Sequence, residues 1–188
     1  MFRKGAILLS IMLLAFVTAC GSHKSANATS AAGGSATGAP VGMSSGQCPT
    51  HNTKSFAKTR FVADAALAGG AFKHWIYTPM KEGKFAKGAH GRVGSIVKAG
   101  LAGAFVLNRL NAAKNAAEAS PLLCKLTIAP IQKFTASIKN IVSSGKHGFG
   151  SISDSSVNGA NGVLSQFHSG AASGGAGFTD NQNANIGG

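Results

Sequence analysis

Apolar side chains recur every three or four positions along the chain between residues 53 and 145. This spacing places them on one face of a helix, and no segment follows the two-residue period of a strand. Three such stretches span residues 53–77, 91–119 and 121–145. Their apolar faces comprise Phe61, Ala65, Ala68, Phe72, Trp75 and Ile76; Val93, Ile96, Val97, Leu101, Ala104 and Phe105; and Leu122, Leu123, Leu126, Ile131, Phe134, Ile138, Ile141 and Val142. The predicted fold class is all-α.

Local signals mark where these helices begin and end. Asn52 or Thr53 can cap the first helix, and Pro79 is expected to end it. Pro121 suits the first position of the third helix, and Pro130 inside that helix predicts a kink or a restart. We expect these helices to run up, down and up in a small antiparallel three-helix bundle over residues 48–150.

The segments on either side of this domain are rich in small polar residues. Residues 20–47 cannot bury enough apolar area to offset their ordering entropy, so they are expected to form a flexible linker. Residues 151–170 keep a loose helical spacing and can form a short fourth helix, although their glycines favour irregular chain instead. Residues 171–188 are expected to be an extended or disordered tail.

The N-terminus has the composition of an export signal. Arg3-Lys4 precedes an apolar run from Gly5 to Val17, which is too short to span a membrane. The following Val17-Thr18-Ala19-Cys20 resembles the lipobox of bacterial lipoproteins. The resemblance implies that residues 1–19 are a cleaved signal peptide and that Cys20 carries a lipid, such as palmitate, on the extracytoplasmic face of the cell membrane. The alternative is an ordinary signal peptide with a chance cysteine.

The predicted helical domain carries a second resemblance. Cys48-Pro49-Thr50, Lys58-Thr59-Arg60-Phe61 and Leu123-Cys124-Lys125 give it a limited similarity to uncharacterised lipoproteins of Gram-positive actinobacteria. That resemblance implies no activity.

The remaining two cysteines are expected to pair. An exported protein folds in an oxidising compartment, where Cys48 and Cys124 form an even set once Cys20 is acylated. In an up-down-up bundle the first and third helices begin at the same end, which brings the two cysteines together. A bridge across this loop would stabilise the fold by about 3–5 kcal/mol. Two buried free thiols are the alternative.

One acidic residue lies at the edge of the first apolar face. When the second helix folds back on the first, Asp64 lies opposite Val106, one turn from Arg109. A carboxylate at such an edge needs a partner, so we expect a structural ion pair with Arg60 or Arg109. A solvated edge residue or a functional acid are the other interpretations.

Small residues are dense in the first two helices, among them Gly69, Gly70, Gly100 and Gly103. Each glycine inside a helix costs about 0.5–1 kcal/mol relative to alanine, so some contact must compensate. Tight packing between the first two helices is the expected reason. Insertion into a bilayer is less compatible with the lysines that interrupt the apolar runs.

Composition narrows the range of functions that the chain could have. The chain has 188 residues, enough for one ordinary domain, with 18 Lys and Arg against 5 Asp and Glu and a net charge of +13. Scarce acids disfavour carboxylate-dependent enzymes. The histidines are far apart, and metal-ligand spacings, a nucleophile elbow and phosphate loops are absent. We therefore expect a non-enzyme without a metal or cofactor, although an unrecognised enzyme is an open alternative.

The basic charge is expected to gather at one end of the bundle, which we call the basic pole. It comprises Lys73, Lys81, Lys84, Lys87, His90, Arg92, Lys139 and Lys146, with Trp75, Tyr77 and Phe85 as neighbours. Such a surface attracts anionic lipid headgroups or phosphate polymers of the cell envelope, and no specific nucleic acid is expected. The expected function is an anchored, non-catalytic lipoprotein that binds such a partner. The alternatives are a bacteriocin-like or toxin-like membrane-active protein, and a basic surface that is merely solvated.

Overall fold

The computed structural model describes residues 47–146 and 153–186. The predicted signal peptide, Cys20 and the predicted linker up to residue 46 lie outside these described residues. The elements are α1 (Ala57–Phe72), a π-helical turn η1 (Lys73–Tyr77), α2 (Thr78–Lys81), α3 (Arg92–Ala117), α4 (Pro121–Lys146) and α5 (Asp154–Ser173). The described residues contain no strand, so the all-α prediction is confirmed.

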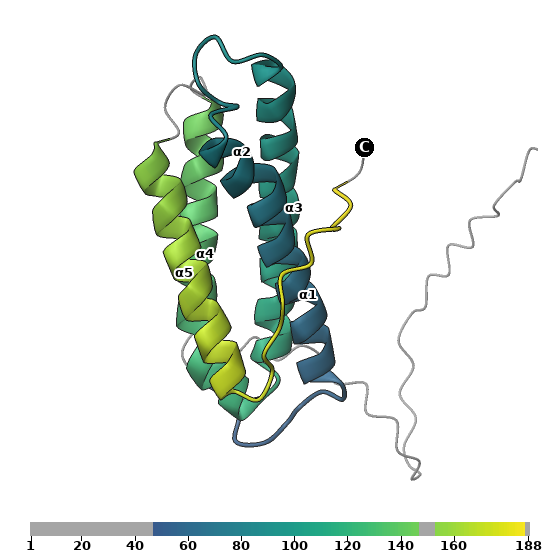
Figure 1. Cartoon of the computed structure of the whole chain (residues 1–188). Coiled ribbons are helices and arrows are strands. Elements are labelled where there is room, and N and C mark those ends of the chain that lie inside the picture. The colour runs from purple at the N-terminus through teal and green to yellow at the C-terminus, as the bar shows by residue number, and fades with distance from the viewer. Residues whose placement is uncertain (1–46, 147–152, 187–188) are drawn as a thin grey trace, which may run out of the picture. The chain divides into compact units, whose positions relative to one another are not determined.

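The long helices run alternately up and down (Figure 1). α1 packs mainly on α3, α3 on α4, and α4 on α5. The fourth helix, which was one of two interpretations of residues 151–170, is present as α5 and extends to Ser173. Its first turn is capped by Ser153, whose side chain accepts a hydrogen bond from the backbone N–H of Ser156 at 3.2 Å. The cap satisfies one of the free N–H groups at the start of α5.

The prediction that Pro79 ends the first helix is wrong. The chain continues from α1 through η1 into α2 and stops only at Lys81. A proline ring clashes with the carbonyl four residues earlier, and the wider π-helical turn just before Pro79 accommodates it. In that turn the N–H of Thr78 bonds to the carbonyl of Lys73, five residues back.

Pro130 lies inside α4, which runs without a break from Pro121 to Lys146. Proline has no N–H, so it leaves the carbonyl of Leu126 without its helical donor. Gly170 of α5 lies against this carbonyl, and an added Cβ at Gly170 would be 2.5 Å from its oxygen. A side chain at position 170 would therefore push α5 away from α4.

The core follows the predicted face in α1, but not in α3. Phe61, Ala65, Ala68, Phe72 and Ile76 are buried. In α3 the core face is made largely of small side chains, and four residues that the sequence assigned to it are exposed. The buried α3 residues are Ile96, Ala99, Ala102, Gly103, Val106, Leu110, Ala113, Ala116 and Ala117. The exposed ones are Val93 (73%), Val97 (56%) and Leu101 (50%). Ala104 is exposed as well.

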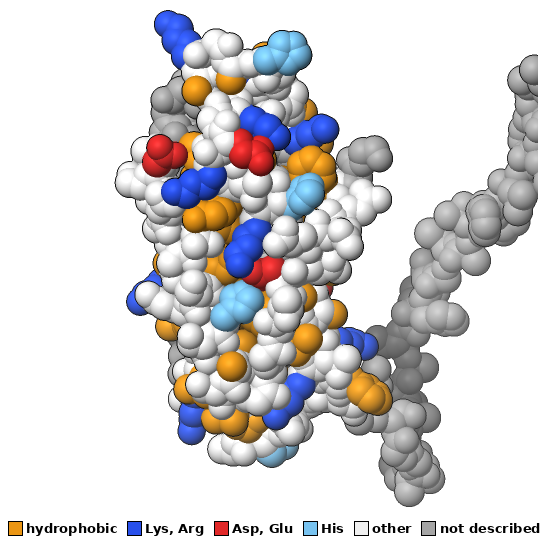
Figure 2. All heavy atoms as spheres, in the orientation of Figure 1, with side chains coloured by type: hydrophobic (Ala, Val, Ile, Leu, Met, Phe, Trp, Pro, Cys, Tyr) orange, Lys and Arg blue, Asp and Glu red, His pale blue; other side chains and the backbone are white. Residues whose placement is uncertain are grey.

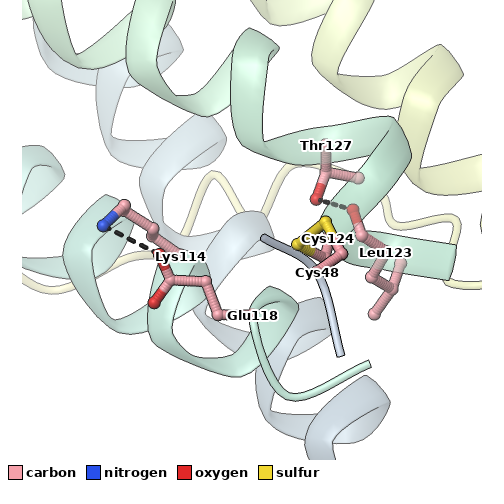
Figure 3. Close-up of a disulfide and its surroundings, with 6 residues drawn as sticks. All are labelled: Cys48, Lys114, Glu118, Leu123, Cys124 and Thr127. Carbon is pink, nitrogen blue, oxygen red and sulfur yellow. Dashed lines mark hydrogen bonds and ion pairs between the residues drawn. A yellow bond between two sulfur atoms is a disulfide. The ribbon is translucent and has the colours of Figure 1, made fainter. Parts of the chain in front are cut away.

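A disulfide joins the segment before α1 to the first turn of α4 (Figure 3). Cys48 and Cys124 are bonded, with their Cα atoms 5.6 Å apart, so the predicted pairing is confirmed. Nearby, the backbone N–H of Thr53 bonds to the carbonyl of Ala119 at 2.9 Å. These links hold the starts of α1 and α4 at the same end of the bundle.

The C-terminal tail differs from the prediction of extended or disordered chain. Residues 174–186 run back along α1, across the seam between α1 and α5 (Figure 1). Phe178 packs against Phe61 of α1 and Phe167 of α5, with ring centroids 6.3 and 5.1 Å away. The N–H of Asn181 bonds to the carbonyl of Ala66 at 2.9 Å. The tail is ordered because it fills a seam that the helices leave open.

Candidate functional site

The connection between α2 and α3 carries the centre of the predicted basic pole. Its backbone needs positive φ at Gly83, Gly88 and Gly91, a conformation that glycine adopts without strain. Phe85 anchors the connection, because its side chain is only 4% exposed. The Arg92 guanidinium also holds the backbone of the connection, because its Nε donates a hydrogen bond to the carbonyl of Phe85 at 2.9 Å. Phe85 and Arg92 thus hold the connection in place, and the predicted anion-binding role of Arg92 stays a prediction.

Lys73 belongs to a partly buried ion cluster instead of the basic pole. Its ammonium is 2.7 Å from the Asp180 carboxylate, which is 5% exposed. The other oxygen of Asp180 lies 2.9 Å from Nε2 of His168 on α5. The His168 ring packs on Phe178, with centroids 4.2 Å apart. Asp180 therefore bridges η1 and α5 through the tail, and Lys73 is not free to bind an external anion.

The other predicted members of the pole differ in exposure and pairing. Lys84 pairs with Glu82 at 2.6 Å at the surface. Lys81, Lys87, His90 and Lys139 are exposed, and no ion pair involves them within the described part of the chain. The side chain of Lys146 is outside the description. On the face drawn in Figure 2, acidic side chains lie beside Lys and Arg side chains.

Two half-buried aromatic rings lie next to exposed lysines. The Lys81 ammonium is 5.8 Å from the centroid of Tyr77, and that of Lys98 is 5.5 Å from the centroid of Trp75. A cation over an aromatic face is attracted to the ring by about 0.5–1 kcal/mol at exposed sites. Lys98 was not predicted to belong to the basic pole. Its contact with Trp75 adds it to the exposed cations of the pole.

The predicted ion pair of Asp64 is made by Arg109. Nη1 of Arg109 lies 3.1 Å from Oδ1 of Asp64, between α1 and α3. Arg60, the other candidate, is exposed. The guanidinium of Arg109 also lies 5.3 Å from the ring centroid of Phe105. The pair joins two helices across the bundle, as a structural ion pair would.

The glycine pair in α1 is explained by the tail and not by α3. An added Cβ at Gly69 would overlap the Asp180 carboxylate, and one at Gly70 would overlap the backbone of Asn181. The expectation that these glycines serve close packing of the first two helices is therefore wrong. The sequence feature that could have indicated the Asp180 cluster was the pair Gly69 and Gly70, one turn before Lys73. The acid itself could not be found, because it lies 107 residues further along the chain from Lys73.

The described residues contain no group of three or more His, Cys, Asp or Glu side chains that could hold a metal ion. In that same part of the chain, α3 is the one helix long and apolar enough to cross a membrane by length and composition, a test that core helices of soluble proteins also pass. Comparison with models of known protein families, with curated proteins and with solved structures finds no match.

Proposed function

We propose that the chain is an exported lipoprotein, anchored through Cys20 to the extracytoplasmic face of a membrane, whose basic pole binds an anionic envelope component without catalysis. The observation that carries the binding proposal is the exposure of Lys81, Lys87 and Lys139 without ion pairs in the described residues. Unpaired cations at one end attract an anionic partner and concentrate it there.

The pairing of the acids supports a non-catalytic role. Asp64, Glu82, Glu118 and Asp180 each form an ion pair with a lysine or an arginine. Asp154 is in the first turn of α5, where the helix dipole stabilises a negative charge. Glycoside hydrolysis needs two carboxylates that converge on one substrate, whereas each of the four paired acids is engaged by its own cation.

Binding of the full chain to vesicles tests the basic pole. The vesicles consist of phosphatidylcholine with or without phosphatidylglycerol, and a poly(glycerol phosphate) polymer serves as the second probe. Each Lys near an anionic surface contributes about 1 kcal/mol, so Lys81→Gln and Lys87→Gln should each weaken binding to the anionic probe about fivefold. Added salt should weaken binding as well, because it screens exposed charges.

Matched substitutions at the opposite end are the control. Lys54 and Lys125 are exposed, and they lie near the disulfide, away from the basic pole. Their change to Gln removes the same charge from the chain. Equal weakening by all four variants would mean that net charge alone attracts the probe, and the pole would have no special role.

The anchor is tested separately. Fatty-acid labelling of the expressed chain should mark the parent and not Cys20→Ala, because in a lipobox the cysteine is the acylated residue. Labelling of both proteins would refute anchoring at Cys20.

A membrane-active, toxin-like function is the second candidate, and the apolar composition of α3 favours it. Release of a dye from sealed vesicles distinguishes the two functions. A tethered binder leaves the vesicles intact at physiological salt, whereas a membrane-active helix releases the dye.

A further inference from the structure

We infer that the N-terminal half of α3 lies on the surface of an anionic lipid bilayer, with its exposed aliphatic side chains entering the interface. Val93, Val97 and Leu101, here called the α3 stripe, follow one another at intervals of four residues along one side of the helix. This inference rests on the proposed function and names the partner that the cationic surface would meet.

The α3 stripe is apolar surface that the fold itself does not use. Its three side chains are 73%, 56% and 50% exposed, while Ile96 and Ala99 on the other side of the same turns are buried. Only 33% of the most apolar 18-residue window of α3 is buried inside the protein. An amphipathic helix that keeps one face in a bundle can place the other at an interface without crossing the membrane.

The backbone beside the α3 stripe is also left open. An added Cβ at Gly94 or Gly100 would meet no atom within 4 Å. Glycine at these helical positions lowers the stability of the helix, and among the described residues no close approach of a neighbouring element requires it. The small residues leave the aliphatic side chains of the stripe as the most prominent groups on this side of the helix.

Charge complementarity selects a lipid surface over a second copy of the chain. Lys98 is exposed and follows Val97 directly, and Lys87 and His90 lie in the connection just before α3. Between residues 65 and 117 the single acid is Glu82, which pairs with Lys84. Two such surfaces would repel each other. An anionic bilayer supplies both negative headgroups for the cations and an apolar interior for the stripe.

Vesicle partitioning of the full chain carrying Cys20→Ala tests the inference without help from an acyl anchor. On vesicles of phosphatidylcholine and phosphatidylglycerol, Leu101→Gln should lower the partition coefficient about tenfold, because the buried apolar area is lost. Leu122→Gln is the matched control, since Leu122 is 48% exposed but lies on α4 near the disulfide. It should leave partitioning unchanged.

Three further experiments make the test independent of folding defects and of self-association. Val93→Gln changes the most exposed side chain of the α3 stripe and should weaken partitioning in the same direction. Trp75 is the single tryptophan of the chain and lies beside Lys98, so bilayers with brominated lipids should quench its fluorescence. Light scattering of the vesicle-free protein should give the same mass for the parent and for Leu101→Gln.

The outcomes separate this inference from the proposed function. If Leu101→Gln and Val93→Gln bind like Leu122→Gln while Lys87→Gln still binds more weakly, the basic pole binds anions and the inference about the α3 stripe is overturned. A change in mass without a change in partitioning would show that a second copy covers the stripe, which also overturns it. Failure of the parent to bind either vesicles or polymer would overturn the proposed function together with the inference.

Discussion

Gly70→Ala gives the most direct test of the ordered tail. Gly70 is buried in α1, and the backbone of Asn181 occupies the place where an added Cβ would lie. Backbone atoms cannot rotate away as the end of a flexible side chain can. The substitution must therefore displace the tail from α1, although alanine itself is the better helix former.

The expected change in stability is the balance of three contributions. Alanine gains about 1 kcal/mol from helix propensity. Displacement of the tail loses the hydrogen bond from Asn181 to Ala66, worth about 1 kcal/mol, and part of the apolar burial of Phe178, worth about 2 kcal/mol. Gly70→Ala should therefore destabilise the protein by about 2 kcal/mol.

Gly159→Ala is the matched control for this prediction. Gly159 lies on α5, is exposed, and an added Cβ would meet nothing within 4 Å. The same substitution should stabilise the protein there by about 0.5–1 kcal/mol. Urea unfolding followed by circular dichroism measures both changes. Hydrogen exchange at the Asn181 amide should be slow in the parent and faster in Gly70→Ala.

The signs of the two changes in the free energy of unfolding decide whether the tail lies against α1. If Gly70→Ala stabilised the protein as much as Gly159→Ala, the tail would not lie against α1, and the Asp180 cluster would be wrong with it. A destabilised Gly70→Ala variant in which the Asn181 amide stays fully protected would place the strain elsewhere in α1.

Two other contacts allow equally simple measurements. Replacing Cys48 and Cys124 by Ser opens a loop with a sequence separation of 76, and the free energy of unfolding should fall by about 4 kcal/mol; an unchanged urea midpoint would contradict this. For Asp64 and Arg109, a double-mutant cycle with alanine should give a coupling energy of about 0.5–1 kcal/mol, because the side chains are 18% and 36% exposed and solvent screens the pair. Exact additivity of the two substitutions would mean that the pair adds nothing to stability.

The sequence pattern located the core of α1 because large side chains alternate there with small and polar ones. Phe61 and Phe72 mark the face of the helix that points into the core, and both are fully buried. In α3 the apolar residues surround most of the helix, so a face chosen by side-chain size pointed to Val93 and Leu101. The inner face is instead lined by alanines, because α3 packs closely on both α1 and α4. Periodicity alone could not distinguish these two sides.

The tail could not be predicted, because its order depends on contacts made by distant residues. Its composition is rich in Gly, Asn and Ala, which is typical of a disordered segment. What holds it are Phe178 among the aromatic rings, and the Asp180 carboxylate between Lys73 and His168. Each interaction joins residues that a local pattern does not connect. These contacts act together with the buried side chains of Ala176 and Ala184 and with the hydrogen bond from Asn181 to Ala66, and together they oppose the conformational entropy of the free segment.

The ordered tail also changes how the net charge is distributed. Residues 48–150 contain 15 Lys and Arg residues and 3 acids, so this part alone would be positive along its whole length. The tail brings Asp180 next to Lys73, and this ion pair neutralises one cation in the middle of the bundle. Near the α2–α3 connection, Lys81, Lys87 and Lys98 form no ion pair in the described residues. Exposed charges act over about 10 Å at moderate salt, so the attraction for anions that we propose would be concentrated near this end, next to the α3 stripe. An apolar stripe and unpaired cations side by side are what a charged lipid surface requires, whereas a soluble polyanion would use only the cations.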